Sequence, residues 1–211
     1  MVPPVVWHPV AELLRADGWQ VAEAPSLGRA PSSFDDALAS FLVAVPKDQD
    51  VVPISHSNAG LYVPALTTHR RVVGYVFVDA VLPPPSGQAP MIPPDLYEFL
   101  VPKADAEGML PGWTQWWDED ISGLFPNADV QAEIERAEPR LLLSYFRGAV
   151  SIPAGWDKHP AAYLSFGDSY AQERADATSR GWPVRTIPGE HLHMLVNPTQ
   201  VTAELTALLA I

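Results

Sequence analysis

A serine at the end of a short apolar run is the residue of this chain best placed for chemistry. The run of residues 51–54 ends in the turn Ser-His-Ser-Asn-Ala-Gly at residues 55–60. A strand that turns at once into a helix strains its turn residue and projects that side chain above the sheet edge, beside free backbone N–H groups. Small residues are needed two positions before and after, and Ser55 and Ala59 meet that need. The spacing therefore predicts that Ser57 is a nucleophile.

The same turn also fits an ordinary connection between a strand and a helix. The common form of the nucleophile motif has glycine at both flanking positions, where this chain has Ser55 and Ala59. Ser and Asn are also frequent helix N-caps in α/β proteins. The turn alone leaves both interpretations open.

A histidine late in the chain could activate such a serine. His191 and His193 follow Gly189 on a loop after the last expected strand, and that loop belongs at the sheet edge where Ser57 emerges. A serine hydroxyl is a weak nucleophile at neutral pH, and a neutral imidazole within hydrogen-bonding reach supplies the general base that it needs. A lone histidine is more often a packed or solvent-facing residue. Two histidines after a glycine on a late loop favour the catalytic interpretation for this chain.

The elements that must position these residues alternate between helices and strands in two blocks. Apolar spacing and breakers predict helices at residues 9–18, 33–42, 58–68, 171–180 and 198–209. Strands are expected at residues 19–24, 51–54, 71–80, 161–166 and 184–187. This alternation predicts an α/β fold with a mostly parallel sheet flanked by helices.

The alternation stops between residues 81 and 160, where Pro and Gly separate short helical pieces at 94–100, 113–118, 129–138 and 139–146. We therefore expect an α/β core of residues 1–80 and 161–211 with an inserted helical cap, or lid, of residues 81–160. Three tryptophans lie within five positions of this cap, at Trp113, Trp116 and Trp117. Such rings pack the cap onto the sheet, and any that face the cleft would favour an apolar or aromatic substrate.

The serine turn, the late Gly-x-His of residues 189–191 and the cap between them resemble the α/β-hydrolase superfamily over nearly the whole chain. The resemblance implies that Ser57 is the nucleophile and His191 the base, with His193 a neighbour that lines the pocket. It also implies a carboxylate between them in chain order. Asp168, after the strand at 163–166, is the preferred acid, and Asp79 and Glu173 are the alternatives.

The resemblance further implies two backbone N–H donors that stabilise an oxyanion. One is the N–H of Asn58, and the other must come from Val5, Val6 or Trp7, because the two prolines before them have no N–H. The family places a strand and a donor loop before the first helix seen here, so this chain is expected to begin inside that loop. Losing one donor costs on the order of 10² to 10³ in rate.

Composition excludes several classes of protein. The 211 residues carry a net charge of −12 without a basic cluster, which argues against nucleic acid or an anionic membrane as a partner. The chain has no cysteine, so disulfides, thiolate metal sites and a cysteine nucleophile are excluded. The first residues lack a charged start and a long apolar run, so a cytoplasmic protein is expected. Phosphate loops and metal-ligand spacings are missing from the sequence, and we expect neither metal nor cofactor.

These observations lead to three functional hypotheses. The leading one is a serine hydrolase that acts on an ester, thioester or similar acyl bond of a small apolar metabolite. The second is a non-hydrolytic enzyme, a cyclase, lyase or isomerase, in which His191 does acid-base chemistry. The third is a ligand-binding relic of the fold. The sequence leaves open whether the protein forms a homodimer.

Overall fold

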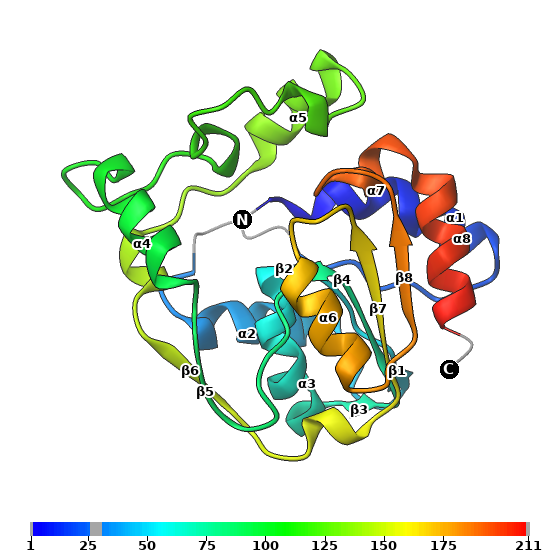
Figure 1. The fold of residues 1–211 in the computed structure, drawn as a ribbon. Coiled ribbons are helices and arrows are strands. Elements are labelled where there is room, and N and C mark those ends of the chain that lie inside the picture. Colours follow the sequence, from blue (N-terminus) through cyan, green and yellow to red (C-terminus); the bar gives the residue numbers. More distant parts are fainter. Residues whose placement is uncertain (1, 26–30, 210–211) are drawn as a thin grey trace.

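A four-stranded parallel sheet forms the centre of the computed structural model, which describes residues 2–25 and 31–209. Its strands are β2 (Ile54–Ser57), β4 (Tyr75–Ala80), β7 (Ala161–Phe166) and β8 (Val184–Ile187), in that spatial order. All neighbours pair in parallel, so their carboxyl ends share one edge of the sheet (Figure 1). β4 and β7 are buried along their whole length, as near-continuous apolar runs predict.

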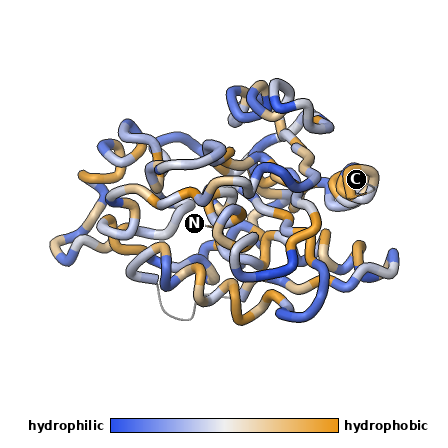
Figure 2. The backbone as a smooth tube through the Cα atoms, turned by 90° about the horizontal axis from the view of Figure 1, so that it is seen from below, coloured by the Kyte–Doolittle hydropathy of each residue, from blue (hydrophilic) through white to orange (hydrophobic). Residues whose placement is uncertain are grey.

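Helices cover both faces of the sheet (Figure 1). On one side lie α1 (His8–Ala16), α7 (His193–Val196) and α8 (Pro198–Leu208), and on the other α3 (Val63–His69) and α6 (Ala171–Ser179), with α2 (Phe34–Ala44) beside α3. α8, seen along its axis at the C label of Figure 2, buries Val201, Leu205 and Leu208 at helical spacing. The predicted α/β class, a mostly parallel sheet flanked by helices, is confirmed.

Side-chain caps fix the start of two of these helices. Ser33 Oγ accepts a hydrogen bond from the N–H of Asp36 at the start of α2. Asn197 Oδ1 accepts from the N–H of Gln200 at the start of α8, where Pro198 occupies the first helical position. Each cap satisfies an N–H that the helix itself leaves unpaired.

The chain between β4 and β7 consists of short pieces and extends from the side of the sheet (Figure 1). It contains α4 (Pro94–Leu100), α5 (Ala128–Ala137) and the 3₁₀ turns η3 (Val101–Lys103), η4 (Trp113–Gln115), η5 (Ser122–Leu124), η6 (Leu143–Phe146) and η7 (Trp156–Lys158). It also contains an antiparallel pair that the sequence did not predict, β5 (Gly87–Pro90) with β6 (Ala149–Ile152). This pair brings together the beginning and the end of the segment.

Two predicted strands are interrupted. Asp50–Val51 (β1) pairs with Arg71–Val72 (β3), separately from the main sheet. Between β1 and β2 stands Pro53, which has no N–H to give to a ladder, and Gly74 lies just before β4. The expected strands at 51–54 and 71–80 are therefore each split in two.

The strand predicted at residues 19–24 does not form. Arg15 of α1 instead binds this segment through its guanidinium, which donates to the carbonyl of Val21 at 3.1 Å and to the carboxylate of Glu23 at 2.7 Å. The segment is thereby held against a helix, not against a strand.

Within the described ranges, no helix has the length and apolar character that a membrane span requires.

Candidate active site

Ser57 lies in a strained turn at the carboxyl end of β2. Its backbone has φ 56° and ψ −133°, and it is one of two non-glycine residues with positive φ among those described. Such a conformation is costly for a residue with a side chain and is typical of functional turns. The turn leads at once into η2 (Asn58–Tyr62) and then α3. This is the strand-to-helix turn that the sequence predicted.

Gly60 explains why the turn needs small residues. A Cβ at this position would overlap the carbonyl oxygen of Val81, the residue that follows β4. The N–H of Val81 in turn donates to the carbonyl of Ser57 at 3.1 Å. The turn is therefore packed closely against the next strand end, which holds Ser57 in place.

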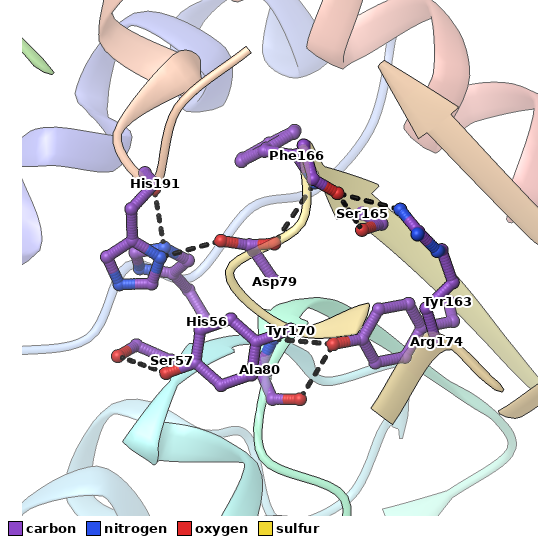
Figure 3. A network of polar contacts seen from close by, with 11 residues as sticks. His56, Ser57, Asp79, Ala80, Tyr163, Ser165, Phe166, Tyr170, Arg174 and His191 are labelled. Carbon is purple, nitrogen blue, oxygen red and sulfur yellow. Dashed lines mark hydrogen bonds and ion pairs between the residues drawn. The ribbon is translucent and has the colours of Figure 1, made fainter. Parts of the chain in front are cut away.

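His191 and Asp79 form a hydrogen-bonded pair at the same sheet edge (Figure 3). The Nδ1 atom of His191 lies 2.7 Å from Oδ2 of Asp79, whose side chain is fully buried. The other carboxylate oxygen accepts from the N–H of Phe166 at 3.1 Å. A carboxylate on Nδ1 orients the imidazole and leaves Nε2 for proton transfer.

This geometry corrects the choice of Asp168 as the acid. The Asp168 side chain is 86% exposed and pairs with Arg174 at 2.8 Å. Gly167 has φ 59°, so the chain turns sharply after β7 and Asp168 enters the turn towards α6, facing solvent. The place beside His191 is taken by Asp79, one of the two alternative acids named from the sequence. Glu173, the other alternative acid, lines the cavity over the site and is half-buried, and burial raises its pKa.

Tyr170 is a site residue that the sequence analysis missed. Its hydroxyl lies 3.2 Å from Ser57 Oγ, and its ring stacks on His191 with 5.5 Å between centroids (Figure 3). Burial is the main cause that raises its pKa to about 12. The signal was a tyrosine three residues after the glycine at the end of β7, and sequence alone does not say which way it points.

His56, inside the serine turn, supports the histidine loop. Its Nε2 atom lies 3.0 Å from the carbonyl oxygen of His191, and its ring lies 4.4 Å from the His191 ring. Burial, followed by the nearby His191, holds the pKa of His56 well below its ordinary value. His56 therefore serves as a neutral hydrogen-bonding group that ties β2 to the loop.

The expected oxyanion donors are only partly available. The N–H of Val6 donates to the carbonyl of Pro3 at 3.2 Å within η1 (Pro4–Trp7), so it is engaged and the expectation for Val6 is corrected. Trp7 lines the cavity and places its ring edge 5.8 Å from His56. Asn58 follows Ser57 directly, and its side-chain amide donates to the carbonyl of Met91 at 2.5 Å. That contact anchors the serine turn to the chain beyond β5.

His193 does not line the cavity as expected. It begins α7, packs closely on Gly189 and lies 5.6 Å from the ring of Phe166. The turn at residues 190–193, in which the N–H of His193 donates to the carbonyl of Glu190, places the two histidines on different sides. Only His191 of the two is among the described cavity-lining residues.

A cavity of about 710 Å³ opens over Ser57 and His191. Its walls come from the sheet edge and from residues 81–160, and they include the aromatic side chains Trp7, Phe41, Trp113, Trp116, Trp117, Phe146 and Tyr170. Its described lining contains the carboxylates of Glu119, Glu173 and Glu190 and neither lysine nor arginine. The site is thus a largely apolar chamber of the size that small-molecule sites have. In the described part of the chain, no group of three or more His, Cys, Asp and Glu side chains could hold a metal ion.

Comparisons with known proteins agree with this architecture. No family model and no curated relative matches the chain. A polyneuridine aldehyde esterase mutant is similar in structure, with 16% identity over 98% of this chain and 94% of that chain, at a TM-score of 0.72. A tomato methylketone synthase I variant complexed with beta-ketoheptanoate has 14% identity over 99% of this chain and 94% of that chain, at a TM-score of 0.75. An extracellular alpha/beta-hydrolase from a Paenibacillus species has 16% identity over 98% of this chain and 94% of that chain, at a TM-score of 0.73. The chain therefore has the α/β-hydrolase fold, as the sequence resemblance implied.

Proposed function

We propose that this protein is a serine hydrolase that cleaves an ester, thioester or similar acyl bond of a small apolar or aromatic molecule. The observation that carries the proposal is the strained Ser57 turn at the sheet edge that also holds the Asp79–His191 pair. In this mechanism Ser57 Oγ bonds to the acyl carbon, its proton passes to His191 Nε2, and the carbonyl electron pair moves to oxygen. The N–H of Asn58 would stabilise that oxygen. The carbonyl then re-forms, the bond from the acyl carbon to the leaving group breaks, and the leaving group takes the proton from His191. Water next attacks the acyl-enzyme with His191 as base, and the acid product leaves as Ser57 regains its proton.

The substrate class follows from the cavity. Its aromatic walls favour apolar or aromatic groups, and its volume fits a small molecule. Structural neighbours include an esterase and a pyrethroid hydrolase, which supports ester cleavage as the reaction. The proposal includes residues 81–160 as the cap of an α/β core formed by residues 1–80 and 161–211. We further propose a cytoplasmic location and a reaction that needs neither metal nor cofactor. Sedimentation measurements would show whether the protein forms a homodimer.

The second candidate is acid-base chemistry without an acyl-enzyme. The observation that favours it is the hydrogen bond of Ser57 Oγ to Tyr170, since no Ser57 to His191 bond is found among the described residues. A methylketone synthase has a similar fold, and one fold can host reactions of different classes, which supports acid-base chemistry as the alternative. In this reaction His191 alone would move the proton.

Covalent labelling separates the two candidates. A fluorophosphonate should attach to Ser57 of the wild type, as peptide mass spectrometry would show, and Ser57→Ala should abolish both labelling and p-nitrophenyl ester hydrolysis. Ser169→Ala is the matched control, because Ser169 lines the same cavity on the loop before Tyr170. Loss of the nucleophile costs up to about 10⁶ in kcat in serine hydrolases. Hydrolysis that survives in Ser57→Ala would refute the nucleophile. A wild type that resists labelling, together with turnover lost in His191→Gln, would support the second candidate.

A further inference from the structure

Tyr170 contacts the reacting part of the site at two points, through its hydroxyl and through its ring. It lies 3.2 Å from Ser57 Oγ, and the ring that carries it stacks on His191 at an interplanar angle of 24°. The residue stands at the N-cap of α6, on the loop that leaves β7, and its side chain lines the cavity. Proton transfer from Ser57 to His191 does not itself require the Tyr170 hydroxyl.

The phenol can act as a donor but not as a base. Because burial raises the pKa of Tyr170 to about 12, its hydroxyl stays protonated at neutral and mildly alkaline pH. A neutral phenol that faces the serine can hold the serine hydroxyl in the free enzyme and can donate to an oxygen that becomes negative.

The side of the site on which Tyr170 lies identifies that oxygen. His191 must deliver its proton to the leaving group, so the leaving oxygen lies on the His191 side of the attacked carbon. Tyr170 is stacked on this same imidazole. An oxygen bonded to the attacked carbon is close to Ser57 Oγ and therefore within reach of a phenol that now contacts Oγ.

We propose that Tyr170 is a catalytic residue that holds the Ser57 hydroxyl in the free enzyme and hydrogen-bonds the leaving-group oxygen as the acyl-enzyme forms. This inference rests on the proposed hydrolase function. In the step, the bond from carbon to the leaving oxygen breaks and its electron pair stays on that oxygen. The proton that came from Ser57 passes from His191 to the same oxygen. Tyr170 keeps its own proton and contributes only a hydrogen bond.

Leaving-group dependence tests this role. Tyr170→Phe keeps the ring on His191 and removes only the hydroxyl. For an alkyl ester, whose alkoxide must be stabilised as it departs, kcat/KM should fall about 10-fold or more, as for one lost hydrogen bond to a charged group. For the p-nitrophenyl ester of the same acid, whose anion leaves readily, kcat/KM should change by less than about threefold. The parameter kcat/KM reports the acylation half-reaction, in which the leaving group departs.

Two controls keep the result interpretable. Tyr97→Phe, on α4 and outside the cavity lining, should leave the ratio of the two esters unchanged. Labelling of Tyr170→Phe by a fluorophosphonate, whose fluoride needs no proton to leave, should proceed as in the wild type and would show that the site is folded. A uniform fall for both esters, or no change for either, would overturn the role of Tyr170. A wild type that neither labels nor hydrolyses esters would instead overturn the proposed function.

Discussion

The carboxylate of Asp79 binds Nδ1 of His191 at 2.7 Å from the end of β4, the strand next to the one that carries Ser57. Asp79 itself has a positive φ of 43°, so the chain turns abruptly there and its side chain is directed to the histidine loop. The carboxylate that contacts His191 thus stands one strand earlier in the sheet than Asp168, the acid implied by the sequence resemblance.

Replacing Asp79 should therefore damage catalysis far more than replacing Asp168. Asp79→Asn should lower kcat for ester hydrolysis by about 10² to 10⁴, because the amide presents the wrong partner to Nδ1 and favours the wrong tautomer. Asp168→Asn should change kcat by less than about threefold, because it breaks only an exposed ion pair with Arg174. Steady-state kinetics of the two variants side by side provide the measurement. The assignment fails if Asp168→Asn is the more damaged variant.

The sequence predicted those parts of the site that local spacing determines. The strained turn at Ser57 was predicted because a strand-to-helix turn demands small flanking residues, and the position of His191 because it follows Gly189 on the last loop. The catalytic roles of both residues stay predictions. These are features of one short segment each. The parallel sheet was predicted for the same reason, since β4 and β7 are continuous apolar runs.

The remaining parts depend on how distant segments meet. Asp79 and Asp168 both follow a strand, and only the packing of β4 against β7 decides which carboxylate reaches His191. Tyr170 contacts Ser57, which lies 113 positions away in the sequence, and His56 contacts His191, which lies 135 positions away. No local pattern encodes contacts of this kind. The prediction of a strand at 19–24 was wrong, and the side chain of Arg15 binds that segment to α1 instead.

Gly60 should tolerate no side chain. In Gly60→Ala the new Cβ would overlap the carbonyl oxygen of Val81, so the serine turn or the end of β4 must shift. We expect a loss of about 1 to 3 kcal/mol in the free energy of unfolding, as for overpacked cores, together with lower activity. Gly123→Ala is the control, since a Cβ there meets nothing within 4 Å, and it should change stability by about 0.5 kcal/mol at most. Urea unfolding of both variants tests this. Equal stabilities would contradict the close packing.

His56 should make the fold sensitive to mild acid. In the folded protein the pKa of His56 is held well below its ordinary value. In the unfolded chain His56 is protonated as the pH falls below ~6.5, whereas in the folded protein it stays neutral. The unfolded state then binds more protons, and stability falls as the pH drops below that value, by at most about 1.4 kcal/mol per pH unit. The stability that depends on neutral His56 is therefore fully present above pH ~6.5 and is lost progressively below it.

Urea unfolding at pH 7.5 and 5.5 measures this effect. The loss of stability between the two pH values should be smaller in His56→Gln than in the wild type, whatever the absolute stability of the variant. His69→Gln, at the exposed end of α3, should keep the wild-type pH dependence. If His56→Gln and the wild type lose stability equally, His56 is not the group responsible.

The charge of the cavity should select against anionic substrates. Its described lining includes Glu119, Glu173 and Glu190 without a lysine or arginine to neutralise them. We therefore expect p-nitrophenyl butyrate to be cleaved with at least about 10-fold higher kcat/KM than the p-nitrophenyl monoester of succinate, a repulsion of about 1.4 kcal/mol. Glu173→Gln should narrow this difference, while Glu107→Gln, outside the described lining, should not. Because burial raises the pKa of Glu173, lowering the pH should narrow the difference as well. Equal kcat/KM for the two esters would show that these carboxylates do not act on the bound acyl group.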